Sequence, residues 1–484
     1  MSALAAVAPA LAEKVPPFWR RPTFLARLAV LLLAAAIWFA PVPEGLTLPA
    51  WRLFALFLAT IAAVIVGAFP IFTASLFALA LAVLTGTLKP AAAYAGFANP
   101  TILLIVIAFL VARAVVLCGL GARLGHMVVS VFGRSTLGLS YSIFVVDGVI
   151  APAFPSNTAR AGVLYPLVYS LCQAAGVKPG PGGRPRLGSF LMFSGMASLS
   201  LSSALWFTAM AANPLGAEIA RTFGVEIGFG SWLLAASVPT LAAMVLLPLV
   251  LFKLTAPEVR ATPAAPAAAR EALAALGPLS RAEKIVAGTF VGMVAAWAVA
   301  GTFHIDSTAI ALLGLGVLLA TGVLTGSDIA KEGDVLATFI WFAVLYTMSG
   351  QLNELGFMGY LGLRFSGALG GLSWPVVYVA LAGAYVLLHY LFVSQTAQVL
   401  ALFGVFLGVG VKLGVPAAPL AFLLLFASNF FSVITPQGSS ANLLFTDSGY
   451  LSQKDAYRLG AIATGFSLLV FLIVGTPWLH AVAR

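Results

Sequence analysis

Long apolar runs recur along almost the whole of this 484-residue chain. A helix needs about 20 apolar residues to cross the hydrocarbon core of a membrane. The residues are 61% hydrophobic and 8% charged, whereas soluble domains carry about 25% charged residues. A soluble enzyme, a disordered chain and a nucleic-acid binder are therefore excluded. The sequence predicts an all-α polytopic membrane protein with about eleven crossings, near 24–43, 51–69, 71–88, 99–117, 188–212, 231–252, 284–303, 307–325, 336–353, 417–446 and 457–481.

Two further apolar stretches, 137–175 and 374–412, are too long for one crossing, and a polar cluster interrupts each near its middle. The first cluster is Ser-Asn-Thr-Ala-Arg from residue 156, and the second is Ser-Gln-Thr-Ala-Gln from residue 394. Each stretch predicts a re-entrant hairpin that enters the membrane and returns to the same side. Its tip must be covered by protein, because irregular backbone is not tolerated in lipid.

Basic residues indicate the side of each loop, because Lys and Arg accumulate on the cytoplasmic side. With a cytoplasmic N-terminus, 18 of the 25 Lys and Arg residues fall inside, six fall outside, and Arg160 falls in neither set. The split supports this orientation, and we expect a multi-pass protein of the cell inner membrane. The expected organisation is a cytoplasmic tail and first crossing (1–50), a first repeat (51–253), a cytoplasmic linker (254–283) and a second repeat (284–484).

Three segments of the first half resemble segments of the second half at a nearly constant separation. SNTARAGVLYP from residue 156 is matched by SQTAQVLALFG from residue 394, and the segments from 115 and 200 are matched from 351 and 436, so the separations are 236 to 238 residues. Each half holds five crossings and one hairpin, and an odd number of crossings makes the second copy inverted. Inverted repeats with paired broken segments are typical of secondary transporters that bind substrate at the midplane.

Polar residues gather at the hairpin tips and in the crossing after each hairpin. Ends of broken helices expose N–H groups and favour an anion, and hydroxyl and amide side chains add donors. Helix–helix hydrogen bonding is the alternative role, but the clusters occupy matching positions in the repeat. We therefore expect a small dianion to contact Ser156, Asn157, Thr158, Arg160, Ser202, Ser203, Ser394, Gln395, Thr396, Gln398, Thr435, Pro436, Gly438 and Ser439.

Arg160 is the charged residue of the first tip. A charge near the bilayer centre costs roughly 2.5–3.5 kcal/mol, and a guanidinium binds a carboxylate through two hydrogen bonds. Asp147, in the other arm of the hairpin, is the alternative partner. Because Asp147 lies nine residues before Ser156, substrate is the preferred partner. His389, near the second tip, is interpreted as a packing residue.

At the tips the chain resembles the divalent anion:sodium symporter (DASS) family. Ser156-Asn157-Thr158 matches the family's Ser-Asn-Thr motif, Ser394-Gln395-Thr396 is a variant of the second triplet, and Thr435-Pro436 matches a Thr-Pro pair in the broken tenth crossing. APAFPSNTARAG and DSGYLSQKD are similar to the exchanger branch, which contains plastid 2-oxoglutarate/malate translocators and bacterial citrate, tartrate and succinate antiporters. The resemblance implies a homodimer whose subunits each have a scaffold and an elevator-like transport domain.

Two coupling modes are open. An unpaired guanidinium on an empty carrier resists passage through a dry interface, which favours obligatory exchange of a C4-dicarboxylate or 2-oxoglutarate. The alternative is a Na⁺- or H⁺-coupled symporter of a dicarboxylate or another divalent anion such as sulfate. Gln398 stands where the exchanger branch often has a histidine, which removes a second cation from the predicted site.

The remaining function classes are disfavoured. A passive channel needs a continuous polar stripe, and an intramembrane enzyme needs a convergent catalytic set; the sequence predicts neither. No cofactor or metal is expected, Na⁺ being a co-substrate only of a symporter. The expected partners are the dianion, membrane lipid and a second copy of the chain, and not nucleic acid.

Overall fold

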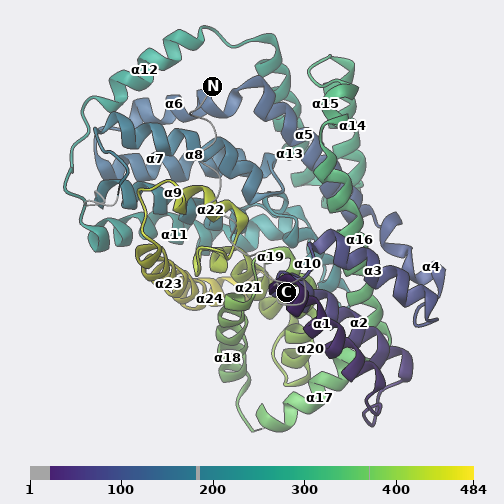
Figure 1. The fold of residues 1–484 in the computed structure, drawn as a ribbon. Helices are drawn as coiled ribbons and strands as arrows, with labels where there is room; N and C mark the ends of the chain where they lie inside the picture. The colour runs from purple at the N-terminus through teal and green to yellow at the C-terminus, as the bar shows by residue number, and fades with distance from the viewer. Residues whose placement is uncertain (1–21, 181–185, 370, 484) are drawn as a thin grey trace, which may run out of the picture.

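The chain is almost entirely helical in the computed structural model, which describes residues 22–180, 186–369 and 371–483 (Figure 1). No β-strand occurs in these ranges, where Ser135 and Ala261 form one isolated bridge. This agrees with the predicted all-α class. Residues 1–21, which hold most of the predicted cytoplasmic tail, lie outside the described residues.

Ten helices of the described chain are long and apolar enough to cross a membrane. Three of them are arms of the predicted hairpins, and the other seven coincide with predicted crossings. Those seven are α2 (Leu48–Ile65), α5 (Pro100–Cys118), α9 (Arg186–Leu205), α11 (Phe229–Thr255), α13 (Arg281–Phe303), α16 (Gly333–Glu354) and α23 (Gln453–Val470), which continues through η8 (Phe471–Gly475) into α24 (Thr476–Val482). The other four predicted crossings contain shorter apolar helices: α1 (Pro22–Phe39), α3 (Ile71–Leu84), α14 (Ser307–Ala320) and α21 (Ala417–Phe430).

The same order of elements occurs twice. Each half contains, in order, three crossings, a short helix, a hairpin, a crossing that is broken in its middle and a last crossing. The first copy comprises α2, α3, α5, α6 (Leu120–Phe132), α7 (Thr136–Ile150), α8 (Asn157–Ala174), α9, α10 (Ala212–Arg221) and α11. The second comprises α13, α14, α16, α17 (Phe357–Leu369), α18 (Trp374–Leu387), α19 (Gln395–Gln398), α20 (Gly404–Lys412), α21, α22 (Ser440–Thr446) and α23.

Both hairpins turn in the same way. After α7 the chain passes through a 3-10 turn, η3 (Ala151–Ala153), and after α18 through η5 (Leu388–Leu391). An extended serine then starts the returning helix: Ser156 Oγ accepts a hydrogen bond from Ala159 N, and Ser394 Oγ accepts one from Ala397 N, both at 3.3 Å. Serine favours this position because its hydroxyl satisfies an otherwise free N–H at the helix start.

The centre of the molecule is α9, which is buried from Leu187 to Leu205 and packs against α7, α8, α11 and α21. Its small residues let neighbours approach closely, as is usual between membrane helices. A methyl group on Gly188 or Gly195 would collide with the rings of Tyr450 and Phe445. By contrast, α13 and α14 carry exposed Val291, Leu312 and Leu313, which is the apolar surface expected against lipid.

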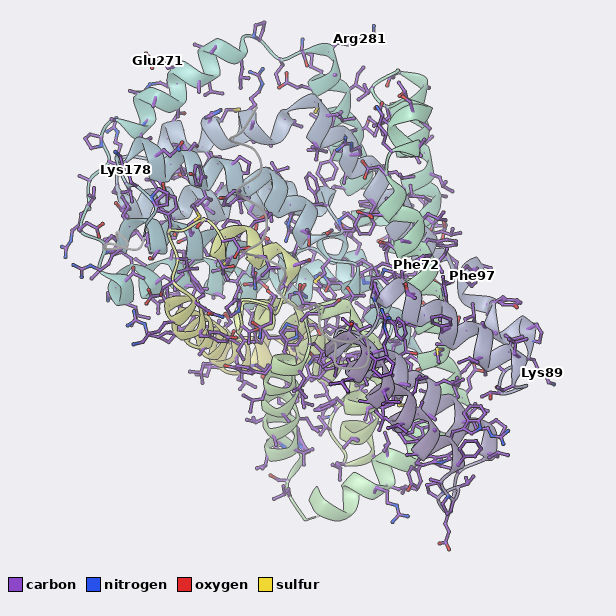
Figure 2. All side chains as sticks on the ribbon, viewed as in Figure 1. Phe72, Lys89, Phe97, Lys178, Glu271 and Arg281 are labelled. Carbon is purple, nitrogen blue, oxygen red and sulfur yellow. The ribbon has the colours of Figure 1, made fainter. Side chains whose placement is uncertain are left out.

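The linker between the halves is more ordered than the sequence predicts. Within the predicted loop 254–283, residues Ala265–Leu276 form α12, which packs along α6 (Figure 1). Arg123 on α6 reaches Glu283 at 2.5 Å and the carbonyl of Gly277 at 2.8 Å. Figure 2 shows Lys178 and Glu271 at one edge of the molecule and Lys89 at the other.

Candidate functional site

The tips of the two hairpins touch. Asn157 Nδ2 donates a hydrogen bond of 3.1 Å to Gln395 Oε1, although 238 residues separate them. Gln395 Nε2 in turn donates to the carbonyl of Ser428 at 3.0 Å. The predicted motifs of the two halves therefore meet at one place, where both returning helices begin.

A cavity of about 450 Å³ opens at this meeting point. Seven of the fourteen predicted site residues line it: Ser156, Asn157, Thr158, Ser394, Gln395, Thr396 and Ser439. These side chains supply hydroxyl and amide groups, which bind an anion through donated hydrogen bonds. Phe109, Trp341 and Phe342 give the cavity an apolar wall. Such a mixture suits a small molecule with polar ends and a hydrocarbon middle.

The breaks in the two broken crossings are stabilised by the same kind of hydrogen bond. In the first, Asn213 Nδ2 donates to the carbonyl oxygens of Ser203 at 2.9 Å and Trp206 at 3.2 Å. In the second, Asn442 Nδ2 donates to those of Ser432 at 2.8 Å and Thr435 at 3.2 Å. We call each arrangement an asparagine clamp. It satisfies the carbonyl groups that a broken helix leaves without partners.

The prediction that substrate is the partner of Arg160 is corrected by the structure. Arg160 Nε lies 3.4 Å from Asp147 Oδ1, and both side chains are fully buried. Arg160 Nη2 donates to Asn157 Oδ1 at 2.6 Å, so the guanidinium sits behind the tip and does not line the cavity. The spacing argument failed because residues 151–156 form the turn itself. Asp147 and Arg160 are thus each about one helical turn from the tip, on facing arms.

Ser202 and Ser203 also lie behind the tip and outside the cavity lining. Ser202 Oγ donates to Asp147 Oδ2 at 2.5 Å, and Ser203 Oγ accepts from Arg160 Nη2 at 2.6 Å. Both serines are fully buried. They supply part of the polar surroundings that a buried charge requires, although Asp147 Oδ1, Arg160 Nε and Arg160 Nη1 have no hydrogen-bond partner among the described residues.

Four predicted residues near the second tip are likewise buried and do not line the cavity: Gln398, Thr435, Pro436 and Gly438. Gln398 Oε1 lies 2.7 Å from His389 Nδ1, and its Nε2 donates to the carbonyl of Tyr385 at 2.8 Å. His389 Nε2 lies 2.8 Å from the carbonyl oxygen of Gly438. His389 is therefore a packing residue, as predicted, and it ties the second hairpin to the second broken crossing.

Several cavity residues escaped the sequence analysis. Ser440 contacts Thr158 hydroxyl to hydroxyl at 2.7 Å, and it follows directly after a predicted residue. Glu332 and Asp334 line the cavity from the start of α16. They lie just after α15 (Gly326–Ala330), where the Thr325 hydroxyl holds the pKa of Asp328 below its usual value. The only sequence signal was an acidic loop, which resembles any solvated connection.

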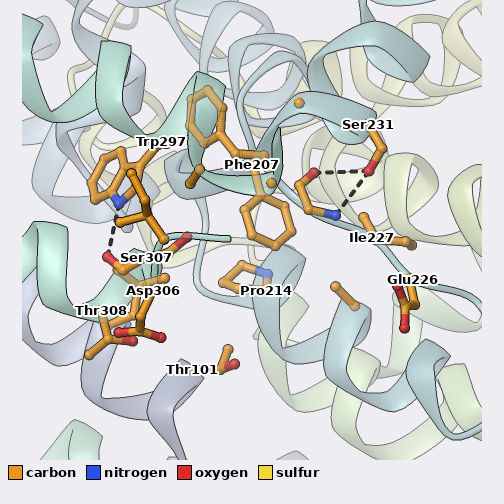
Figure 3. A pocket seen from close by; sticks show the side chains of 18 of the residues that line it. Thr101, Phe207, Pro214, Glu226, Ile227, Ser231, Trp297, Asp306, Ser307 and Thr308 are labelled. Carbon is orange, nitrogen blue, oxygen red and sulfur yellow. Dashed lines mark hydrogen bonds between the residues drawn. The ribbon is translucent and has the colours of Figure 1, made fainter. Parts of the chain in front are cut away.

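The larger cavity, of about 840 Å³, lies away from the tips and is lined by none of the predicted residues (Figure 3). Phe207, Pro214 and Trp297 form its walls, and Asp306 lies near the start of α14. One helix lines both cavities, because Leu104 of α5 faces the larger one and Phe109 faces the smaller one. The two cavities therefore lie at different depths along α5.

Comparison with known proteins places this architecture in a family. Residues 22–483 match the sodium:sulfate symporter transmembrane region family. The chain belongs to this family. The match spans nearly the whole sequence, so the DASS resemblance predicted from the tips is confirmed, and the chain is a multi-pass membrane transporter rather than an enzyme.

Known proteins are similar to this chain along most of their length. The putative malate transporter YflS of Bacillus subtilis is 41% identical over 93% of this chain and 96% of the relative. The chloroplastic dicarboxylate transporter 1 of Arabidopsis thaliana is 38% identical over 99% of this chain and 88% of the relative. The crystal structure of the Alcanivorax borkumensis YdaH transporter has the same fold, with a TM-score of 0.57 and 16% identity over 95% of this chain and 98% of that one.

Proposed function

We propose that this chain carries small dicarboxylates across the membrane. The observation that supports this most directly is the meeting of the two tips in one cavity, where hydroxyl and amide groups from matching positions of both halves face one space. The names of the similar Bacillus and Arabidopsis transporters support a dicarboxylate as the substrate. The seven predicted residues that line the cavity are the proposed substrate contacts.

We further propose that transport follows an elevator movement. The hairpins and broken crossings would move as one block against α5, α13, α14 and α16. The two cavities support this movement, because α5 faces both of them at different depths. We also propose that the two repeats are inverted, that the protein is a homodimer, and that it lies in the inner membrane with a cytoplasmic N-terminus. These proposals rest on the repeated element order, on the distribution of basic residues and on the family resemblance.

Exchange is the proposed coupling mode, and it now rests on the resemblance to the exchanger branch alone. The argument from an unpaired guanidinium does not hold, because Asp147 lies against Arg160 and the two charges cancel. An empty carrier would therefore move without an uncompensated charge at this position.

A cation-coupled symporter is the second candidate, and the cavity lining favours it. Glu332 and Asp334 are the charged residues that line the cavity. A dianion beside two carboxylates is repelled unless cations accompany it. Bound Na⁺ or protons would supply the missing charge.

Counterflow in proteoliposomes tests both proposals. Purified protein is reconstituted with malate inside, and uptake of labelled malate is measured with and without Na⁺. We expect uptake that requires internal dicarboxylate and is indifferent to Na⁺. Uptake into empty vesicles driven by a Na⁺ or proton gradient would establish the symporter instead. Transport of sulfate with no transport of malate, succinate or 2-oxoglutarate would refute the dicarboxylate assignment.

A further inference from the structure

The cavity has an electrostatic imbalance that its proposed substrate does not relieve. Of the described residues that line it, the charged ones are Glu332 and Asp334, and both are acidic. Arg160 does not compensate them, because it is buried behind Asn157 and lies against Asp147. A dianion entering this cavity therefore meets negative charge with no cation in the lining itself.

A positively charged residue, Arg113, lies next to the cavity lining, at a place that we call the rim. Arg113 lies on α5, one helical turn after Phe109, which lines the cavity. Its Nε contacts Glu332 Oε1 at 3.0 Å. The side chains of Arg113 and Glu332 are 35% and 28% exposed. The pair therefore spans from α5 to the start of α16, and both side chains are partly exposed, although Arg113 Nε itself is buried.

We expect opening of this ion pair to cost little free energy. Partly exposed ion pairs contribute little to stability, because water and salt screen them. The Glu332 side chain also presents the same chemical group as the end of a dicarboxylate. A guanidinium donates hydrogen bonds to any carboxylate of suitable geometry, so a substrate carboxylate competes with Glu332 for the Arg113 guanidinium.

We propose that Arg113 recruits the substrate anion at the cavity rim and that Glu332 is a built-in competitor for it. The inference rests on the proposed transport of dicarboxylates. Arg113 positions an entering carboxylate beside the tips, and Glu332 reoccupies the guanidinium when the substrate moves on. Glu332 thereby sets how weakly the anion is held at the rim.

A set of single and double variants separates competition from a general charge effect. Glu332→Gln removes the competitor, and Asp334→Asn removes the same charge from the same cavity. Each is combined with Arg113→Gln, and Glu271→Gln on exposed α12 is the charge-matched control. KM for malate is measured in proteoliposomes at two ionic strengths, and equilibrium binding of labelled malate is measured in detergent. Monodisperse elution shows that each variant is folded, and Arg113→Lys replaces Arg113→Gln should the latter fail to fold.

We expect Glu332→Gln to lower KM and the dissociation constant about 3- to 10-fold, with a larger effect at low salt. Arg113→Gln alone should raise KM. In the Arg113→Gln background, adding Glu332→Gln should lower KM no more than adding Asp334→Asn does. Such non-additivity is the sign of direct coupling. The control should match the parent.

An unchanged or raised KM in Glu332→Gln would overturn this inference, as would an equal gain with and without Arg113. In both cases the parent protein still transports malate, so the proposed function stands. A parent that binds and transports no dicarboxylate would overturn the proposed function and this inference with it.

Discussion

At the scale of single residues, Asn157 joins the cavity to the charges behind it. Its Nδ2 donates to Gln395, and its Oδ1 accepts from Arg160 at 2.6 Å and from Ser203 at 2.5 Å. The guanidinium thus holds the amide in the orientation that the tip contact needs. Arg160 acts on the site through Asn157 and is a positioning residue in this structure.

This arrangement predicts a rescue within the ion pair. Arg160→Gln leaves the Asp147 carboxylate buried without its counter-charge, which costs about 3–5 kcal/mol of stability. Adding Asp147→Asn removes that uncompensated charge and should restore most of the melting temperature of the detergent-solubilised protein. Ser170→Ala, at an exposed position of the same helix, is the control. A double variant no more stable than Arg160→Gln would show that the two charges are not partners.

The tip residues could be predicted from the sequence because hydroxyl and amide groups interrupt apolar stretches at matching positions. The Asp147–Arg160 contact could not, since it depends on how residues 151–156 turn between the two arms. Glu332 was missed for another reason. It is unremarkable as a loop residue, and its significance comes from Arg113 and the tips, which are distant in sequence.

At the scale of elements, close contacts between helices depend on glycine at a few positions. Gly460 of α23 lies against the chain just after α21, where an added methyl would overlap the Val433 carbonyl oxygen and would meet the Ile434 carbonyl oxygen at 3.2 Å. This chain segment lies in the break of the second broken crossing, between α21 and α22. The packing of α23 therefore supports the position of Ser439.

Gly460→Ala should consequently destabilise the protein by about 1–3 kcal/mol, because overpacking forces the backbone to shift. Gly465 lies on the same helix with open space around it. Gly465→Ala should be neutral or stabilising by up to about 1 kcal/mol, since alanine favours a helix over glycine. Thermal unfolding of both variants in detergent is the measurement. Equal effects would show that the contact at Gly460 does not limit the packing.

Helices that are long enough to cross a membrane were predicted well from the sequence, and shorter helices were predicted poorly. Hairpins and crossings follow from long apolar runs with a polar interruption. The helices α6 and α17 have 13 residues each and α12 has 12, which is too short for the crossing criterion. The docking of α12 on α6 depends on Arg123 and Glu283, residues whose pairing no local pattern reveals.

At the scale of the whole molecule, the repeated element order predicts which loops share a side of the membrane. Glu271 on α12 and Lys89 before α4 (Pro90–Ala93) are both exposed and lie at opposite edges in Figure 2. The repeat was predictable because matched tips leave a sequence trace. The meeting of the two tips was not, because it results from packing between the halves.

The predicted orientation can be read from cysteine labelling. In a background with Cys118 and Cys172 replaced, Lys89→Cys should react with a membrane-impermeant maleimide in spheroplasts, in which the inner membrane is intact and its outer face exposed. Glu271→Cys should react only after that membrane is permeabilised. Transport of malate by both variants is the control for native structure. Labelling of Glu271→Cys in intact spheroplasts would reverse the assigned orientation.

The asparagine clamps bear on how such a carrier behaves when it carries nothing. Asn213 and Asn442 each donate hydrogen bonds to the free carbonyl groups of a broken helix. Substrate binding is therefore not needed to order either break. A binding site that is preorganised in this way loses little conformational entropy when substrate binds. Vacant and filled forms should then travel with much the same internal architecture, and the difference between them would come down to electric charge alone.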